Sequence, residues 1–101
     1  MDLYAIYLVS DSVGETADVV IRSALYQFET ENYQLKKYSY VQTTEEIDDI
    51  CAKASEEGKA MIFYTFVKKE MADHMMGQIE KSGLIVIDIY SPILTGLGQL
   101  F

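Results

Sequence analysis

The sequence predicts an α/β domain, a three-layer Rossmann-like or flavodoxin-like fold with four parallel strands in the order 2-1-3-4. Two observations carry this prediction. Apolar stretches of strand length alternate with amphipathic stretches of helix length, which is the pattern of a parallel sheet covered by helices on both faces. The second strand candidate is more polar than the others, so we place it at an edge of the sheet. Right-handed crossovers between the strands then favour the stated order.

The first strand and the first helix are predicted from the first quarter of the chain. Leu3 to Val9 is a continuous apolar run, as expected of a central strand that is buried on both faces. From about Glu15 to Phe28, apolar residues recur at offsets of three and four, which predicts an amphipathic helix. A short polar turn over residues 10–16 separates the two elements.

The second strand and helix follow. Gln34 to Val41 mixes apolar residues with lysines, serine and glutamine, which is the composition expected of the edge strand. Thr43 and Glu46 have the spacing of a capping box, which predicts that a helix begins here. An apolar stripe from Ile47 to Ala54 marks the buried face of that helix.

Two glycines punctuate the rest of the domain. Gly58 is placed to end the second helix in a left-handed conformation, and Ala60 to Val67 follows as a second central, fully apolar strand. A third helix is predicted around residues 71–79 and ends at Gly83. Leu84 to Ile89 is another apolar run, which we predict to be a buried strand.

Composition excludes several classes of protein. With 101 residues, half of them apolar, the chain suffices for one domain with a single core. A net charge of -8 and dispersed basic residues argue against nucleic acid as a partner. Cys51 is the only cysteine and lies in an apolar helical pattern, so we predict a core residue. The first apolar run is too short to cross a membrane and lacks signal-peptide features, which points to the cytoplasm.

The turn between the first strand and the first helix is the strongest candidate site, because open α/β sheets bind ligands at this position. Hydroxyl groups beside the unpaired amides of a helix start suit an anion such as phosphate, and a glycine lets the backbone approach it. Ordinary helix capping, with Ser12 and Glu15 as a capping box, explains the same residues. The candidate ligand-binding residues are Ser10, Asp11, Ser12, Gly14, Glu15 and Thr16, and Asp11 is also a candidate catalytic residue.

Other polar residues are weaker candidates. Asp88 interrupts the last apolar run near its end, where side chains can point into the crevice above the sheet. We rank it second, because an aspartate that bonds to neighbouring backbone would look the same. His74, the only histidine, lies beside an apolar helical stripe and is assigned no catalytic role. We assign no metal ligands, and the chain has neither a P-loop nor a dinucleotide-binding glycine pattern.

The predicted domain covers residues 1–90. Residues 91–101 are unusually apolar for the end of a chain, and we interpret them as a connector. Pro92 stops the preceding strand. The apolar residues from Ile93 to Phe101 require a partner surface, which leaves a homodimer open.

Three segments resemble one known family, the pyruvate, phosphate dikinase regulatory proteins, which are related to the phosphoenolpyruvate synthetase regulatory proteins. Tyr7 to Ala17, with the sequence Tyr-Leu-Val-Ser-Asp-Ser-Val-Gly-Glu-Thr-Ala, is similar to the start of the family. Family members continue with a helix that ends in a Gln-Phe pair, like Gln27 and Phe28. Asp88 to Ile93 is similar to the segment that leads into the family's second half. Val13 departs from the pattern, because threonine is usual there.

The resemblance implies the N-terminal portion of a bifunctional enzyme. Such enzymes phosphorylate a threonine of pyruvate, phosphate dikinase with ADP as donor, and remove that phosphate with inorganic phosphate to release pyrophosphate. ADP and inorganic phosphate are then ligands of the whole protein. The family's nucleotide-phosphate loop lies in the later half, so residues 91–101 would lead to a missing catalytic half and this chain would be inactive alone. Two alternatives remain open, a non-catalytic adaptor of receiver-like type and a domain that binds a phosphate ligand through the turn.

Overall fold

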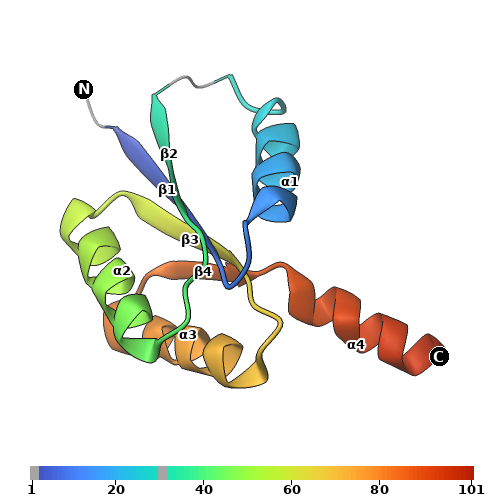
Figure 1. Ribbon diagram of the computed structural model, residues 1–101. Helices are drawn as coiled ribbons and strands as arrows, with labels where there is room; N and C mark the ends of the chain where they lie inside the picture. Colours follow the sequence, from blue (N-terminus) through green and yellow to red (C-terminus); the bar gives the residue numbers. More distant parts are fainter. Residues whose placement is uncertain (1–2, 30–31) are drawn as a thin grey trace.

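The computed structural model describes residues 3–29 and 32–101, which fold into one sheet with helices on both of its faces (Figure 1). The strands are parallel and lie in the order β2-β1-β3-β4. The predicted α/β class and strand order are therefore confirmed. In chain order the elements are β1 (Tyr4–Ser10), α1 (Glu15–Leu25), β2 (Tyr33–Tyr38), α2 (Thr44–Glu57), β3 (Ala60–Thr65), α3 (Lys69–Ser82), β4 (Ile85–Asp88) and α4 (Tyr90–Leu100).

The central and edge positions of the first two strands follow their sequences. β1 pairs with β2 on one side and with β3 on the other, and all its residues from Ala5 to Ser10 are buried. β2 lies at the edge of the sheet, and none of its residues is fully buried. An apolar run thus marks the strand that is covered on both faces, and a mixed run marks the edge.

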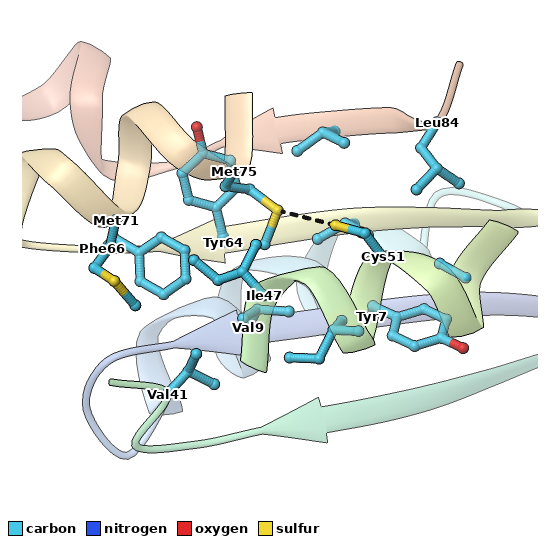
Figure 2. Close-up of a cluster of buried hydrophobic side chains, with 14 of the residues drawn as sticks. Tyr7, Val9, Val41, Ile47, Cys51, Tyr64, Phe66, Met71, Met75 and Leu84 are labelled. Carbon is cyan, nitrogen blue, oxygen red and sulfur yellow. Dashed lines mark hydrogen bonds between the residues drawn. The ribbon is translucent and has the colours of Figure 1, made fainter. Parts of the chain in front are cut away.

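The larger core lies between the sheet and helices α2 and α3 (Figure 2). Tyr7 of β1 and Tyr64 of β3 are both fully buried in it, where Ile47 of α2 and Met75 of α3 cover them. These side chains come from four elements, so their burial removes apolar surface from water only when the helices dock on the sheet.

Cys51 of α2 belongs to this core, as the sequence predicts. The residue is 3 % exposed, and its Sγ lies 3.7 Å from Sδ of Met75 (Figure 2). Burial raises the pKa of the thiol to about 11, and the nearby carboxylate of Asp48 adds to the shift. A neutral and inaccessible thiol packs as a small apolar group and does not act as a nucleophile.

The predicted helix boundaries of α2 and α3 are confirmed by their caps. Thr43 Oγ1 accepts a hydrogen bond from the Glu46 amide at 3.2 Å, and Glu46 Oε1 accepts one from the Thr43 amide at 3.2 Å, which completes the capping box. Gly83 ends α3 in the left-handed conformation, with φ 69°. Gly58 ends α2 with a positive φ of 80°, although its ψ of -50° lies outside the left-handed helical region.

Helix α1 packs on the opposite face of the sheet. Its buried residues Ala17 and Ile21 lie against Ile6 and Leu8 of β1. Val20 has the helical spacing expected of the apolar face over residues 15–28, yet it is 44 % exposed. The helix therefore buries a narrower face than its sequence pattern indicates.

The end of α1 also differs from the prediction, which continued the helix to Phe28. The helix ends at Leu25. The Gln27 and Phe28 amides bond to carbonyls only three residues back, at 3.0 Å each, which tightens the chain into a turn. The Phe28 side chain is left 66 % exposed.

The prediction of a buried strand over Leu84 to Ile89 is wrong for one face of β4, because that face is exposed. Val86 is buried on the side of α2 and α3, whereas Ile85 and Ile87 are 60 % and 42 % exposed on the other side. Helix α1 packs on β1 and β3, and the two isoleucines lie beyond it. The apolar sequence of β4 therefore reflects a surface that the described residues of this chain leave uncovered.

The segment predicted as a connector is helical. Pro92 is the third residue of α4, within the first turn, where a helix needs no amide hydrogen from it. Helix α4 extends away from the sheet (Figure 1), and none of its residues is buried. Within residues 3–29 and 32–101, no helix is long and apolar enough to span a membrane.

One polar contact between the sheet and the end of α2 makes the stability of the fold depend on pH. Glu57 Oε1 accepts a hydrogen bond from the Tyr7 hydroxyl at 2.9 Å and pairs with the ammonium of Lys36. The Lys36 contact, and after it the Tyr7 contact, hold the pKa of Glu57 below its ordinary value although partial burial opposes this. A carboxyl group with a lowered pKa stabilises the folded state above the unfolded pKa of about 4.3, and this contribution is lost as the pH falls through the folded pKa.

We expect Glu57→Gln to lower the free energy of unfolding by about 1 kcal/mol near neutral pH, because solvent screens a side chain that is 31 % exposed. The difference from the unchanged protein should shrink as the pH falls from the unfolded pKa of about 4.3 through the lower folded pKa of Glu57, because the carboxyl group is then protonated in both states. Urea unfolding of the two proteins at a series of pH values measures this. Glu80→Gln, on an exposed part of α3, is the control. A difference that stays constant with pH would show that the Glu57 charge is not involved.

Candidate functional site

The predicted turn lies at the carboxyl edge of the sheet, between β1 and α1. Ser10 at the end of β1 pairs in register with Thr65 at the end of β3, and Tyr64 pairs with Asp88 at the end of β4. The carboxyl ends of three strands thus meet at one edge, which is where open α/β sheets bind ligands. The structure therefore brings the turn and the second-rank candidate Asp88 to the same edge of the sheet.

Ser10 holds the turn together from inside. The residue is 1 % exposed, and its hydroxyl donates to the Thr65 carbonyl at 3.3 Å. The same oxygen accepts a hydrogen bond from the Ser12 amide at 3.0 Å and lies 3.1 Å from the Ser12 hydroxyl. Ser10 is therefore a structural residue of the turn, whereas Ser12 is exposed at its surface.

Asp11 ties the turn to the loop between β3 and α3. Its Oδ2 accepts hydrogen bonds from the amides of Val67 and Lys68, at 2.9 and 3.3 Å. Lys68 is the N-cap residue of α3, so the Asp11 carboxylate fixes the entry to that helix. This arrangement places a negative charge between two loops of the edge, with Lys68 and Lys69 following directly in the chain.

Gly14 is the N-cap residue of α1 and has a φ of 86°, in the left-handed region. A glycine is required there because an L side chain would be strained. A β-carbon at this position would also lie 3.3 Å from Cε of Lys37 and 3.7 Å from Oγ of Ser39. No side chain of the described residues caps the first turn of α1, so the capping box that Ser12 and Glu15 could form is not made.

The end of β2 and the loop after it supply three residues of the edge that were not predicted from the sequence. Ser39 Oγ donates to the Val13 carbonyl at 2.6 Å, and the Tyr40 amide donates to the Ser12 carbonyl at 2.9 Å. Lys37, at the end of β2, lies against Gly14 and is exposed. The turn itself contains no basic residue, so Lys37 brings to it the positive charge that its own sequence lacks.

Glu15 and Thr16 are exposed in the first turn of α1. Thr16 Oγ1 accepts a hydrogen bond from the Tyr90 hydroxyl at 3.2 Å, which joins α1 to the start of α4. Glu15 lies beside the helix amides, and its charge opposes an anion there unless a cation such as Lys37 accompanies it.

Asp88 caps helix α4. Its carboxylate accepts hydrogen bonds from the amide of Ser91, at 2.9 Å, and from the Ser91 hydroxyl. Asp88 thus makes the bonds to neighbouring backbone that are the alternative to a binding role. Burial, followed by the charge of Asp88, raises the pKa of the Tyr64 phenol, whose hydroxyl is buried with no well-formed hydrogen bond to the described residues.

A cavity of about 700 Å³ opens at this edge between helices α3 and α4. Asp88, Lys69 and Asp73 are its charged lining residues, and Phe66 and Met76 are among its apolar ones. No residue of the turn lines it. The crevice near the site thus lies beside Asp88, and the turn forms an open surface next to it.

The sequence predicts neither a set of metal ligands nor a catalytic role for His74. Within the part of the chain that the structure describes, no three His, Cys, Asp or Glu side chains are grouped so that they could hold a metal ion. His74 lies in α3, where its Nε2 is 2.8 Å from Asp48 Oδ1 of α2, and it does not belong to the edge described above. The candidate site therefore consists of hydroxyls, backbone amides, lysines and the carboxylates of Asp11 and Glu15.

Comparison with known proteins identifies the family of the chain. The family described as Kinase/pyrophosphorylase matches residues 6–101. A pyruvate, phosphate dikinase regulatory protein of Alkaliphilus metalliredigens is 37% identical over 93 residues, which are 92% of this chain and 33% of that protein. Proteins of the same name from Oceanobacillus iheyensis and Staphylococcus haemolyticus are 33% and 36% identical over 95% and 100% of this chain, and 35% and 38% of their own lengths.

The chain thus spans about a third of the length of the curated relatives that it matches. The match includes most of β1, the turn and everything that follows them, so it covers the whole carboxyl edge of the sheet. This 101-residue chain belongs to the kinase/pyrophosphorylase family.

Proposed function

We propose that this chain is the N-terminal part of a regulatory phosphotransferase that acts on pyruvate, phosphate dikinase. The observation that supports this most directly is the family match over residues 6–101, together with relatives named as regulators of that dikinase. The position of the turn at the carboxyl edge of a parallel sheet supports a role close to the phosphate groups.

The proposed reactions are two transfers of one phosphoryl group. In the first, a threonine hydroxyl of the dikinase takes the terminal phosphoryl group of ADP, which leaves AMP. In the second, inorganic phosphate takes the phosphoryl group from phosphothreonine, which restores the hydroxyl and forms pyrophosphate. Both steps need positive charge or oriented donors around the phosphoryl oxygens, because negative charge is spread over them in the transition state.

Several groups at the edge suit this requirement. The uncapped amides at the start of α1 and the ammonium of Lys37 can both face a phosphate placed over Gly14. The Ser12 and Thr16 hydroxyls are exposed beside them and can donate or accept a hydrogen bond. Asp11 is the candidate catalytic residue, as a proton acceptor for the threonine hydroxyl that also orients the β3–α3 loop.

A second function is supported by the position of Lys37. A turn with one adjacent lysine and uncapped amides at the start of a helix can bind a phosphate group without catalysing its transfer. A non-catalytic phosphate-binding or adaptor domain would therefore use the same residues. The two functions differ in the residues that they require. Phosphotransfer requires further residues from the two-thirds of the relatives' length that this chain does not match, whereas phosphate binding requires only residues of this chain.

The test is phosphotransfer from ADP to purified dikinase, measured for this chain and for a chimera that joins it to the unmatched part of the Alkaliphilus metalliredigens relative. We expect transfer by the chimera and none by the chain alone. The second reaction, in which inorganic phosphate removes the phosphoryl group from the phosphorylated dikinase and pyrophosphate is released, should follow the same pattern. No transfer by either protein, with inorganic phosphate shifting the NMR signals of residues 10–16, would instead establish the binding domain.

A further inference from the structure

Tyr40, in the loop after β2, has a strained backbone. Among residues 3–29 and 32–101 it is the one residue other than glycine with a positive φ, of 57°. This left-handed conformation brings the β-carbon close to the backbone, so it is an outlier for a bulky side chain. Such residues persist where the surrounding structure forces the conformation, and they cluster at binding and catalytic sites. The conformation of Tyr40 therefore needs a cause in its surroundings.

The backbone cause is the contact between this loop and the candidate turn. The Tyr40 amide donates to the Ser12 carbonyl and the Val41 amide to the Ser10 carbonyl, at 2.9 Å each, so the amides on both sides of the Tyr40 α-carbon are fixed. Val41 is 2 % exposed in the larger core, against which Tyr38 also packs. Alternate residues of a strand share a face, so a spacing of three requires the chain to change direction between them. The left-handed residue at position 40 allows this change.

The backbone does not explain why the residue is a tyrosine. Glycine adopts this conformation without strain and asparagine with little, so either would form the same two hydrogen bonds more easily. Packing within the described residues does not offset the strain, since Tyr40 is 61 % exposed and is not among the residues of either core. A bulky aromatic residue at a position that favours glycine is therefore explained by a contact that its ring makes with another molecule.

The loop that carries Tyr40 runs alongside the candidate turn in the opposite direction. Successive residues of the loop contact successively earlier residues of the turn. The contacts pair Lys37 with Gly14, Ser39 with Val13, Tyr40 with Ser12 and Val41 with Ser10. Tyr40 thus belongs to the candidate site through its backbone, and it lies beside the residue whose exposed hydroxyl can face a phosphate.

The surface at this point combines apolar area with positive charge. Val13 is 43 % exposed, so its side chain and the ring of Tyr40 present apolar area next to the hydroxyl of Ser12. From residue 32 to residue 44 the chain contains two lysines and no Asp or Glu, although its net charge is -8. Aromatic and apolar groups among polar ones are typical of a protein interface, and the lack of carboxylates on this side of the turn suits a phosphorylated segment.

The open shape of the surface favours a protein segment over a nucleotide. Small ligands bind in concave sites that enclose most of their surface, and the cavity of about 700 Å³ near the site is lined neither by Tyr40 nor by the turn. The phosphoryl acceptor, in contrast, is a threonine of a folded protein, and its hydroxyl must reach the phosphoryl group in line. The residues around that threonine then contact the surface beside the turn, and another segment of this protein over Tyr40 would close their approach.

We propose that the ring of Tyr40 binds the segment of the dikinase that carries the acceptor threonine, so that Tyr40 is a recognition residue and takes no part in the chemistry. This assignment rests on the proposed function. The ring anchors the segment through apolar and aromatic contact, while the turn and Lys37 face its phosphate. The fixed backbone holds the anchor in place before the dikinase binds, which reduces the ordering that binding requires.

The first test is steady-state phosphotransfer by the chimera with the Alkaliphilus metalliredigens relative. For Tyr40→Asn we expect the KM for the dikinase to rise about 10-fold or more, while kcat and the KM for ADP stay within about twofold. Tyr40→Phe keeps the ring and should keep the KM for the dikinase within about twofold. Tyr26→Asn is the matched control, because Tyr26 is 87 % exposed outside the site and has an ordinary φ of -61°.

Melting temperatures distinguish this role from packing of the ring on another part of the same protein. In the 101-residue chain, Tyr40→Asn should raise the melting temperature by about 2–6 °C, because strain is relieved and no packing is lost. Tyr26→Asn should not raise it. The chimera should respond in the same direction as the chain. If the ring packs on the two-thirds of the protein that this chain does not match, Tyr40→Asn lowers the melting temperature of the chimera instead.

Binding of the chimera to purified dikinase, measured by titration calorimetry, keeps this proposal separate from the proposed function. An unchanged chimera that binds the dikinase but transfers no phosphate contradicts the proposed function alone, and weaker binding by Tyr40→Asn would still support the role of Tyr40. That role is overturned if the Tyr40→Asn chimera binds as tightly as the unchanged one, if only the KM for ADP rises, or if the melting temperature of either protein falls. An unchanged chimera that does not bind the dikinase overturns it as well.

Discussion

We expect Asp11→Asn to reduce phosphotransfer by the chimera at least about 100-fold while the melting temperature stays nearly unchanged. Asparagine has almost the same shape as aspartate, and its carbonyl oxygen can still accept the amides of Val67 and Lys68, so the β3–α3 loop keeps its position. What is lost is the negative charge that would accept the proton of the threonine hydroxyl. Positioned general bases contribute about 10² to 10⁴ to the rate, which sets the expected size of the effect.

Asp11→Ala separates this role from a structural one. Alanine removes both the charge and the two hydrogen bonds to the loop, so we expect it to lower the free energy of unfolding by about 1–3 kcal/mol in addition to the loss of activity. Single-turnover transfer rates and melting temperatures of both variants are compared. Glu80→Gln, which removes an exposed charge on α3 outside the candidate site, is the control. If the asparagine variant transfers phosphate at the normal rate and only the alanine variant is slow, Asp11 positions the loop and does no chemistry.

The elements that the sequence predicts well are those whose pattern depends on local contacts or on complete burial. β1 and β3 are recognisable because both faces of each strand are covered, and the start of α2 because Thr43 and Glu46 satisfy each other's backbone within four residues. The polar composition of β2 gives its edge position, which then fixes the order of the whole sheet. None of these inferences requires knowledge of a distant part of the chain.

The predictions that failed depend on what covers a surface. The sequence of β4 is as apolar as that of a central strand, and the exposure of Ile85 and Ile87 follows from the length and placement of α1, which lies elsewhere in the chain. Helix α4 was missed because Pro92 and the glycines at 96 and 98 disfavour a helix, and its apolar stripe has no partner within the described residues. Packing normally stabilises such a helix more than its own propensity does.

The residues of the candidate site also divide into those that local sequence predicts and those that depend on distant parts of the chain. The turn and its glycine could be located from the change between strand and helix patterns, because that junction is contiguous in sequence. Lys37, Ser39 and Tyr40 come from the end of β2 and the loop after it, and only the parallel pairing of β1 with β2 brings them to Gly14. A carboxylate such as Asp11 could be named from sequence, but its bonds to the β3–α3 loop required the register between β1 and β3.

Phe66→Ala is expected to have the largest effect on stability of any change at this edge. The residue is 2 % exposed, and its ring lies 5.3 Å from that of Tyr64 and at an angle of 37° to it. Figure 2 shows the ring beside Met71 of α3, at the end of the core nearest the site. Removing a buried aromatic side chain costs about 3–5 kcal/mol, a large share of the about 5–15 kcal/mol that stabilises a domain of this size.

Urea unfolding followed by circular dichroism, at one fixed protein concentration, measures the effect as a lower midpoint with an unchanged slope. Tyr26→Ala, at an 87 % exposed position, should change the free energy of unfolding by less than about 0.5 kcal/mol.

Because Phe66 directly precedes Val67, whose amide bonds to Asp11, the cavity left by its ring should loosen the same loop. The effects of Phe66→Ala and Asp11→Ala should then be less than additive, since each removes part of what the other depends on. A loss below about 1 kcal/mol for Phe66→Ala, or strict additivity of the pair, would contradict this coupling between the core and the candidate site.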